Sequence, residues 1–452
     1  MKRILILLML PLIMLTGTKA GQPESASNIL PYPILQKKLA NGVNVITVPY
    51  DSPGLAAFYI VMRVGSRDEV EEGKSGFAHF FEHMMFRGTD KYSSDKYSEV
   101  LKAIGASANA NTSLDRTVYH MTGNALMLDK MFEIEADRFM NLKYSEQAFK
   151  TEAGAVKGEY TKNYSNPMLQ LDEKISDAAF NKHTYKHTTM GFFKDVVDMP
   201  NQYQYSLDFY KRFYRPELAS IIVVGDVTAE KVNMLAQKYF GIWKTGVSLK
   251  SITPEPVQTE TRYTHIRVPG YPAVLSLNYK SPAYTDANND LEAIDILSNL
   301  LFSETSPLYK KLITNEQKLR ELDPSVFFTR DPYLMGVTAT FVKEEDLIPV
   351  YDEIVAAIEK IKTEPVDEKE LAATKSRLKY SFAMRIDNPG TIAEALSYFT
   401  WVSGDPQSIN RAYRHYDSVT GADIMRVAKQ YFNSNTLTIG TITDTDSSPF
   451  KK

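Results

Sequence analysis

The segment His79-Phe80-Phe81-Glu82-His83 holds the residues best suited to chemistry. If it is helical, His83 lies one turn after His79, and both imidazoles point to the same side about 6 Å apart. This arrangement suits two ligands of one Zn²⁺ ion, and Glu82 lies beside the pair, where a carboxylate can act on water. Phe and Met residues flank the motif, so the helix is predicted to be buried.

Chance explains this pattern poorly. A chain of 452 residues with 7 His and 55 acidic residues should contain His-x-x-acid-His only roughly 0.013 times. The alternative interpretation is a pair of helical histidines and an acid on a solvated surface. Two buried histidines beside a glutamate need a partner, however, and a metal ion is the simplest one.

A catalytic zinc site needs a third protein ligand and an open position. The chain has no Cys, so this ligand must be His, Asp or Glu. A helix predicted from Ser145 carries Glu152 and Glu159 on one face, two turns apart. They suit one ligand and one carboxylate that orients a histidine, although spacing alone fits an ordinary surface pair equally well.

The elements that must position these residues form two similar halves. The first half has predicted strands at 43–48, 56–64 and 221–224 and helices at 76–87, 93–104, 124–140, 145–164 and 206–213. The second has strands at 274–279, 336–341 and 437–442 and helices at 290–302, 347–361, 367–384 and 422–431. We therefore expect a duplicated α+β fold, with domains at 30–245 and 260–447 joined by a linker at 246–259.

Composition narrows the functional class. A net charge of −3 argues against non-specific nucleic-acid binding, and the absence of Cys excludes disulfides and thiolate chemistry. Residues 1–20 have a basic start, a short apolar run and small residues at the end, which is typical of a signal peptide. We expect export to the periplasm of a Gram-negative source or secretion otherwise, with an uncleaved membrane anchor as the alternative.

The segment Gly76 to Thr89 resembles the inverted zinc motif of the pitrilysin/insulinase metallopeptidases. It is most similar to the short-chain branch that includes mitochondrial processing peptidase and bacterial secreted zinc proteases. Further matching segments are Gly65 to Glu69, Asn109 to Tyr119, Tyr214 to Pro216 and Gly225-Asp226. The resemblance spans roughly residues 39–442 and implies two similar domains, each with a largely antiparallel sheet flanked by helices.

The resemblance also implies roles for individual residues. His79, His83 and Glu159 would bind one Zn²⁺ per chain, with Glu82 as the general base and Glu152 as the carboxylate that orients a ligand. The edge-strand residues implied to bind the substrate backbone are Asn109, Ala110, Asn111 and Thr112. We therefore expect a zinc metalloendopeptidase acting on peptides or unfolded segments. The alternative is a non-catalytic assembly or scaffold subunit of the same family.

One departure from the family pattern bears on partners. The second domain usually carries an Arg in Ser-Arg-Leu and a Tyr in Gly-Leu-Ala-Tyr, but this chain has Ser306-Pro307-Leu308 and no Tyr within 317–327. We therefore expect a heterodimer with a sister subunit that supplies Arg and Tyr, or else a homodimer that functions without them.

For the histidines outside this motif, the sequence favours structural roles. His183 and His187 also have helical spacing, but their neighbours are polar, so we expect an exposed loop without metal. His120 follows the edge-strand segment and is expected to be a packed or hydrogen-bonded strand residue.

Overall fold

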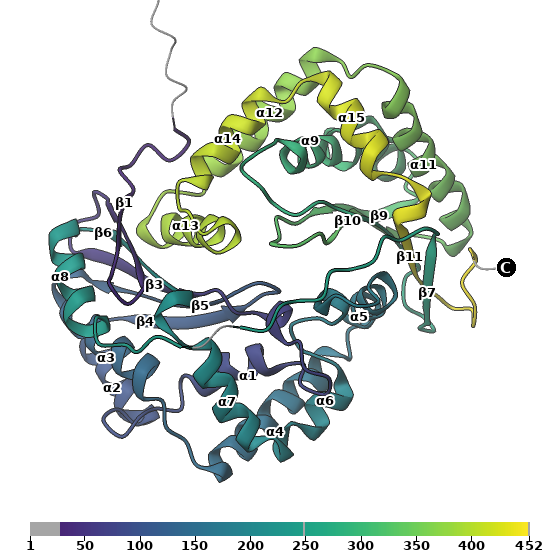
Figure 1. Ribbon diagram of the computed structural model, residues 1–452. Helices are drawn as coiled ribbons and strands as arrows, with labels where there is room; N and C mark the ends of the chain where they lie inside the picture. The colour runs from purple at the N-terminus through teal and green to yellow at the C-terminus, as the bar shows by residue number, and fades with distance from the viewer. Residues whose placement is uncertain (1–27, 247–248, 451–452) are drawn as a thin grey trace, which may run out of the picture.

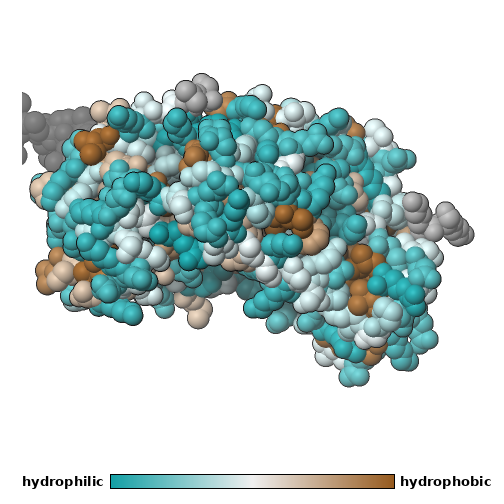
Figure 2. All heavy atoms as spheres, turned by 90° about the horizontal axis from the view of Figure 1, so that it is seen from below, coloured by the Kyte–Doolittle hydropathy of each residue, from teal (hydrophilic) through white to brown (hydrophobic). Residues whose placement is uncertain are grey.

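The computed structural model describes residues 28–246 and 249–450, so the predicted signal peptide lies outside the described residues. Two sheets form the framework, each with helices on both faces (Figure 1). None of the described helices is long and apolar enough to span a membrane. On the face seen in Figure 2, hydrophobic side chains occur only in small groups. That face therefore has no extended apolar patch of the kind that marks a large interface.

The first sheet has six strands in the order β1-β2-β6-β3-β5-β4. Only β2 and β6 run parallel, and the other neighbouring strands are antiparallel. The strands are β1 Leu35–Lys38, β2 Asn44–Pro49, β3 Leu55–Met62, β4 Ser107–Thr112, β5 Thr117–Asn124 and β6 Ala219–Gly225. The central strands β3 and β6 are almost continuously apolar and buried because helices cover both faces of the sheet.

The second sheet has five strands in the order β7-β11-β8-β10-β9. They are β7 Arg262–Arg267, β8 Val274–Lys280, β9 Leu319–Val326, β10 Leu334–Phe341 and β11 Leu437–Thr443. This order repeats β2-β6-β3-β5-β4, and the one parallel pair, β7 with β11, corresponds to β2 with β6. The predicted α+β fold with two similar, largely antiparallel sheets is therefore confirmed.

Most helices cover the outer face of the sheet in their own half (Figure 1). The first half has α1 Phe77–Met84, α2 Ser94–Ala103, α3 Leu128–Asn141, α4 Glu146–Asn163, α5 Pro167–Ala179, α6 Phe193–Asp198, α7 Tyr203–Phe213 and α8 Ala229–Phe240. The second half has α9 Asp290–Phe302, α10 Pro307–Tyr309, α11 Leu347–Thr363, α12 Glu368–Ala383, α13 Pro389–Ser403, α14 Ser408–Ser418 and α15 Gly421–Tyr431. Residues 249–259, within the predicted linker, contain neither helix nor strand.

Each half also contributes one helix to the sheet of the other. Helix α13 packs on β3 and β6, whereas α5 packs on β7 and β11 (Figure 1). Tyr59 of β3 donates a hydrogen bond to the carbonyl oxygen of Gly390 at 3.2 Å. On the other side, a Cβ at Gly440 of β11 would lie 2.7 Å from the side chain of Ile175, so glycine permits the close contact. The predicted linker thus lies between the two sheets in sequence, but the two halves pack directly against each other through α5 and α13.

Candidate metal centre

Helix α1 carries the His-x-x-Glu-His motif and is fixed by aromatic packing. Its eight residues include Phe77, Phe80 and Phe81, all of them buried. The ring of Phe81 stacks on Phe209 of α7 with centroids 5.1 Å apart, and Phe80 contacts Phe149 of α4 at 5.0 Å. The apolar residues that predicted a buried helix therefore anchor it against the two helices beside it.

The start of α1 is held by a side chain from an earlier segment. Gly76 precedes the helix with φ 94°, a conformation that favours glycine, and it has no side chain to cap the first turn. The buried carboxylate of Glu69 instead accepts hydrogen bonds from the backbone N–H groups of Gly76 at 2.7 Å and Ala78 at 2.6 Å. The motif therefore begins at a fixed position although α1 is only two turns long.

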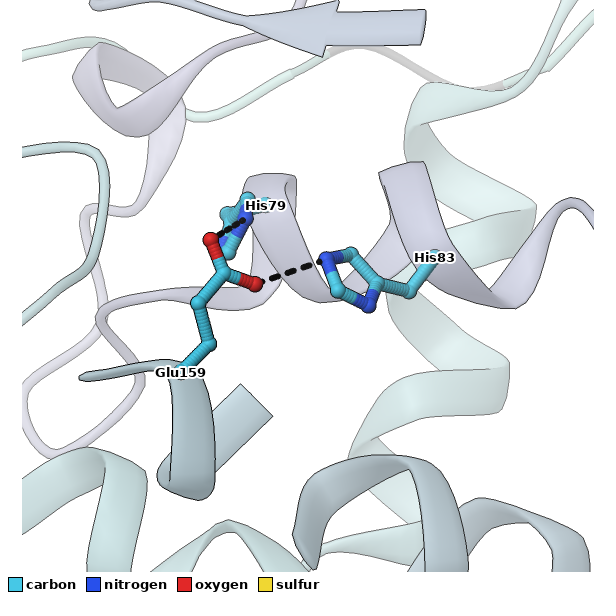
Figure 3. Close-up of side chains that lie close together, drawn as sticks. All are labelled: His79, His83 and Glu159. Carbon is cyan, nitrogen blue, oxygen red and sulfur yellow. Dashed lines mark ion pairs between the residues drawn. The ribbon is translucent and has the colours of Figure 1, made fainter. Parts of the chain in front are cut away.

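The three residues implied as zinc ligands lie together (Figure 3). Nε2 of His79 is 3.7 Å from Oε1 of Glu159, and Nε2 of His83 is 3.3 Å from Oε2 of the same carboxylate. One ligand atom from each residue falls within 4.8 Å of the others. Two residues come from α1 and the third from α4, so the packing of these helices assembles the group.

This group fits a zinc ion. Ligand atoms bound tetrahedrally at about 2.1 Å from Zn²⁺ lie about 3.4 Å apart. One ligand atom from each of the three residues already lies within 4.8 Å of the others, so small side-chain movements would bring all three onto one ion. Two imidazoles and one carboxylate form a donor set of catalytic zinc sites with an open fourth position. Among the described residues, no other cluster of His, Asp and Glu has comparable geometry.

The environment of His79 favours its neutral form. Burial lowers the pKa of His79, and the nearby His83 lowers it further. Its Nδ1 atom is buried without a hydrogen-bond partner among the described residues. A neutral imidazole is the form that binds metal, so burial prepares this side chain to act as a ligand.

Glu152 orients the second histidine. Its Oε1 atom lies 3.0 Å from Nδ1 of His83, and its other oxygen forms an ion pair with Arg87. The hydrogen bond to Glu152 raises the pKa of His83. Burial opposes ionisation of Glu152, but its bonds to His83 and Arg87 outweigh burial and lower the pKa. Nε2 of His83 is thereby turned toward Glu159, an arrangement typical of metal-binding histidines.

Arg87 is a contributor that sequence reasoning did not identify. It belongs to the recognised motif, but nothing in the spacing indicated that its guanidinium would meet Glu152 from α4. The helix predicted at 76–87 ends at Met84 in the structure, so helical spacing from His83 gave no signal for this contact.

Glu82 lies beside the ligand group and faces the edge of the first sheet. Thr112, the last residue of β4, donates its hydroxyl proton to Oε2 of Glu82 at 2.7 Å. The other oxygen of Glu82 has no hydrogen bond among the described residues. A carboxylate held in this way can accept a proton next to the group of ligand atoms.

A cavity of about 1040 Å³ adjoins the site and lies between the two halves. Thr112 and Tyr160, the residue after Glu159, form part of its wall on the first half. Asp323 of β9 and Trp401 of α13 belong to the wall on the second half. Thr112, which contacts Glu82, therefore lies between this cavity and the candidate metal centre.

The residues implied to bind substrate lie on β4, the edge strand of the first sheet. Asn109 is exposed and Asn111 half-buried, whereas Ala110 is buried against the sheet. The outer edge of β4 pairs with no strand in the described part of the chain, so its backbone groups can accept an added strand. The structure thus brings Thr112 to the metal site and leaves the other three along the free edge.

The expectation that His183 and His187 lie in an exposed loop is wrong, because both are buried. Nδ1 of His183 accepts a hydrogen bond from the backbone N–H of Tyr185 at 3.0 Å, and its Nε2 lies 2.9 Å from Asp331 of the second half. Contacts with the other half bury this loop, which its polar neighbours did not indicate. His120 is a packed strand residue as expected, stacked on Tyr59 at 5.0 Å.

Comparison with known proteins identifies the family. Residues 47–191 match insulinase (peptidase family M16), and residues 202–378 match the peptidase M16 inactive domain. The chain belongs to peptidase family M16. The second match fits the duplicated fold, in which only the first half carries a possible metal group among the described residues.

Individual relatives are similar along most of the chain. The zinc protease PqqE of Helicobacter pylori is 29% identical over 409 residues, covering 87% of this chain and 89% of that protein. A probable mitochondrial-processing peptidase subunit beta of Arabidopsis thaliana is 25% identical over 423 residues, covering 89% and 77%. The crystal structure of a protease from Helicobacter pylori has a TM-score of 0.84 and 27% identity, covering 91% of this chain and 100% of the other. Similarity to zinc proteases over most of the chain supports the interpretation that this protein is a metallopeptidase.

Proposed function

We propose that this chain is a zinc metalloendopeptidase that hydrolyses peptides or unfolded protein segments, with one Zn²⁺ per chain. The observation that carries the proposal is the meeting of His79, His83 and Glu159 beside Glu82. The neighbouring residues Thr112 and Tyr160 line a large cavity between the two halves. The similarity to zinc proteases supports the same metal and the same class of reaction.

Bound zinc would supply a Lewis acid that polarises the peptide carbonyl and lowers the pKa of water. The chain's own residues supply the rest. Glu82 takes a proton from the attacking water and passes it to the leaving amine, which is general base and then general acid catalysis. Glu152 keeps His83 in one ring orientation, and β4 binds the substrate backbone as an added strand.

The form of the cavity supports unfolded substrates. A space of about 1040 Å³ between two sheets accommodates an extended segment but not a folded domain. A strand added at β4 is recognised through backbone hydrogen bonds, which depend on extension more than on sequence.

A non-catalytic scaffold subunit is the second candidate. The match of residues 202–378 to an inactive domain is the observation that favours it. The complete set of Glu82 and the three candidate ligands argues against it, because a scaffold has no need for ligand side chains that converge and for a histidine that Glu152 orients.

The sequence also supports a proposal for the chain's partners and a proposal for its location. We propose that a sister subunit supplies the missing Arg and Tyr, with a homodimer as the alternative. We also propose export through the predicted signal peptide at residues 1–20, to the periplasm if the source is Gram-negative.

Zinc content and chelator-sensitive cleavage test the proposal. The purified chain should contain about one equivalent of zinc, and it should cleave an unfolded peptide in a reaction that 1,10-phenanthroline stops and zinc restores. A zinc-loaded protein that cleaves no peptide, alone or with a sister subunit, would favour the scaffold role.

A further inference from the structure

Thr112 lies where the edge strand, the cavity and Glu82 meet. It is the last residue of β4 and belongs to the cavity wall. Its Oγ1 atom is 2.7 Å from Oε2 of Glu82. A peptide bound along β4 would therefore end beside the residue that contacts the base.

The surrounding contacts determine the direction of this hydrogen bond. Thr117 of β5 lies opposite Thr112 in register, and their Oγ1 atoms are 3.5 Å apart. Thr117 donates its own proton to the carbonyl oxygen of Val64 at 3.0 Å. The proton of Thr112 is thus directed to the closer acceptor, the carboxylate of Glu82, and a bond to an ionised acceptor is a strong one.

A nearby cation does not replace this contact. Arg116 contacts the backbone carbonyl of Asn111 at 3.1 Å, and its other terminal nitrogen is 3.7 Å from Glu394. Thr112 is the only side chain within hydrogen-bond distance of Glu82 in the described part of the chain. Without it, the half-buried Glu82 side chain would rotate among several rotamers.

We propose that Thr112 is a positioning residue that holds one oxygen of Glu82 and leaves the other oriented for proton transfer. Since it also ends the edge strand, substrate binding along β4 would fix the same residue that orients the base. This inference rests on the proposed peptidase function. Its effect should appear in kcat, because orientation of a base contributes to the transition state more than to binding.

Replacement of the hydroxyl group provides the test. Thr112→Val keeps the shape of the side chain and should lower kcat about tenfold, or about 1.4 kcal/mol, with KM and zinc content within about twofold of wild type. Thr112→Ser keeps the hydroxyl and should restore kcat to within about threefold. Thr122→Val is the matched control, since the Thr122 hydroxyl on β5 makes no hydrogen bond among the described residues, and it should leave kcat unchanged.

Other results would overturn the inference. A Thr112→Val enzyme with normal kcat and raised KM would make Thr112 a substrate contact only. A lower kcat in Thr112→Ser together with a normal kcat in Thr112→Val would point to packing by the methyl group. If the Val variant does not fold, Thr112→Ala compared with Thr112→Ser gives the same contrast.

A measurement without catalysis separates this inference from the proposed function. In metal-free protein, Thr112→Val should destabilise wild type more than it destabilises Glu82→Ala, which lacks the acceptor, because the hydrogen bond couples the two residues. Equal destabilisation in both backgrounds would refute the contact. If the coupling is present but no zinc-dependent cleavage is found, the proposed function fails while the contact stands.

Discussion

The hydrogen bond between His83 and Glu152 leads to a graded prediction for zinc affinity. Glu152 is only 2% exposed and lies 3.0 Å from Nδ1 of His83. Glu152→Gln preserves the shape and an oxygen acceptor but removes the charge. A hydrogen bond to a charged group contributes about 1.5–3 kcal/mol and a neutral one about 0.5–1.5. The difference of about 1–1.5 kcal/mol corresponds to roughly tenfold weaker zinc binding.

The ion pair between Glu152 and Arg87 changes the expected loss of zinc affinity little. Arg87 is 47% exposed, so it can turn to solvent when the ion pair is lost, and exposed pairs contribute little to stability. Glu152→Ala should weaken zinc binding more, about 100-fold, because Nδ1 of His83 then has no acceptor. Competition with a chromophoric chelator measures both affinities, and kcat/KM on an unfolded peptide should fall in the same order.

Glu146→Gln is the matched control on the same helix. Glu146 is 58% exposed and pairs with Lys150 on the surface, so its replacement should leave zinc affinity unchanged. Wild-type zinc affinity in both Glu152 variants would refute its role in orienting His83. Glu152 would then be a structural residue without effect on metal binding. A complete loss of zinc in Glu152→Gln would instead make it a direct ligand.

Four further outcomes are expected. Glu82→Gln should keep zinc but lose cleavage, whereas Glu159→Gln should lose most of both; metal analysis that gave the reverse would contradict the ligand assignment. Burial lowers the pKa of Lys280 to about 7, whereas an unfolded lysine holds its proton to about pH 10.4, so the free energy of unfolding should rise with pH between these values. Lys280→Met should therefore stabilise the protein by at least about 1 kcal/mol more at pH 6 than at pH 10 in urea unfolding. Glu135→Ala leaves the buried Arg138 without its ion-pair partner and should destabilise by about 3–5 kcal/mol, seen as a lower Tm. A sister subunit with Arg and Tyr should raise kcat/KM at least about tenfold, and an unchanged rate would favour the homodimer.

Local sequence signals were sufficient for the framework and the family. Apolar strands such as β3 and β6 and the repeated order of elements predicted a duplicated α+β fold, which the two sheets confirm. The spacing of His79 and His83 indicated one face of a helix, because helical geometry is local. The third member, Glu159, was only suggested by spacing, since its approach depends on how α4 packs against α1.

Features that depend on contacts between the halves were not predictable in this way. Helices α5 and α13 were missed, and each covers the sheet of the other half. Strands β1 and β7 were also missed because β1 is exposed and β7 is polar and only partly buried, so neither has an apolar pattern. The loop with His183 looked exposed for a related reason: Asp331, the half-buried partner of His183, lies 148 positions along the chain.

The two halves differ most where one holds the candidate metal group. Helix α1 holds the buried His79 and the half-buried His83 and Glu82, polar groups that need partners when water is excluded. Helix α9, which follows the corresponding strand of the second sheet, has no histidine, and Ile294, Leu297 and Leu301 are buried on it. Each such side chain stabilises the fold by about 1.5–3 kcal/mol through burial. The half without metal can thus devote this helix to the core, whereas the first half needs Glu69, Glu152 and Thr112 to satisfy the polar groups of α1.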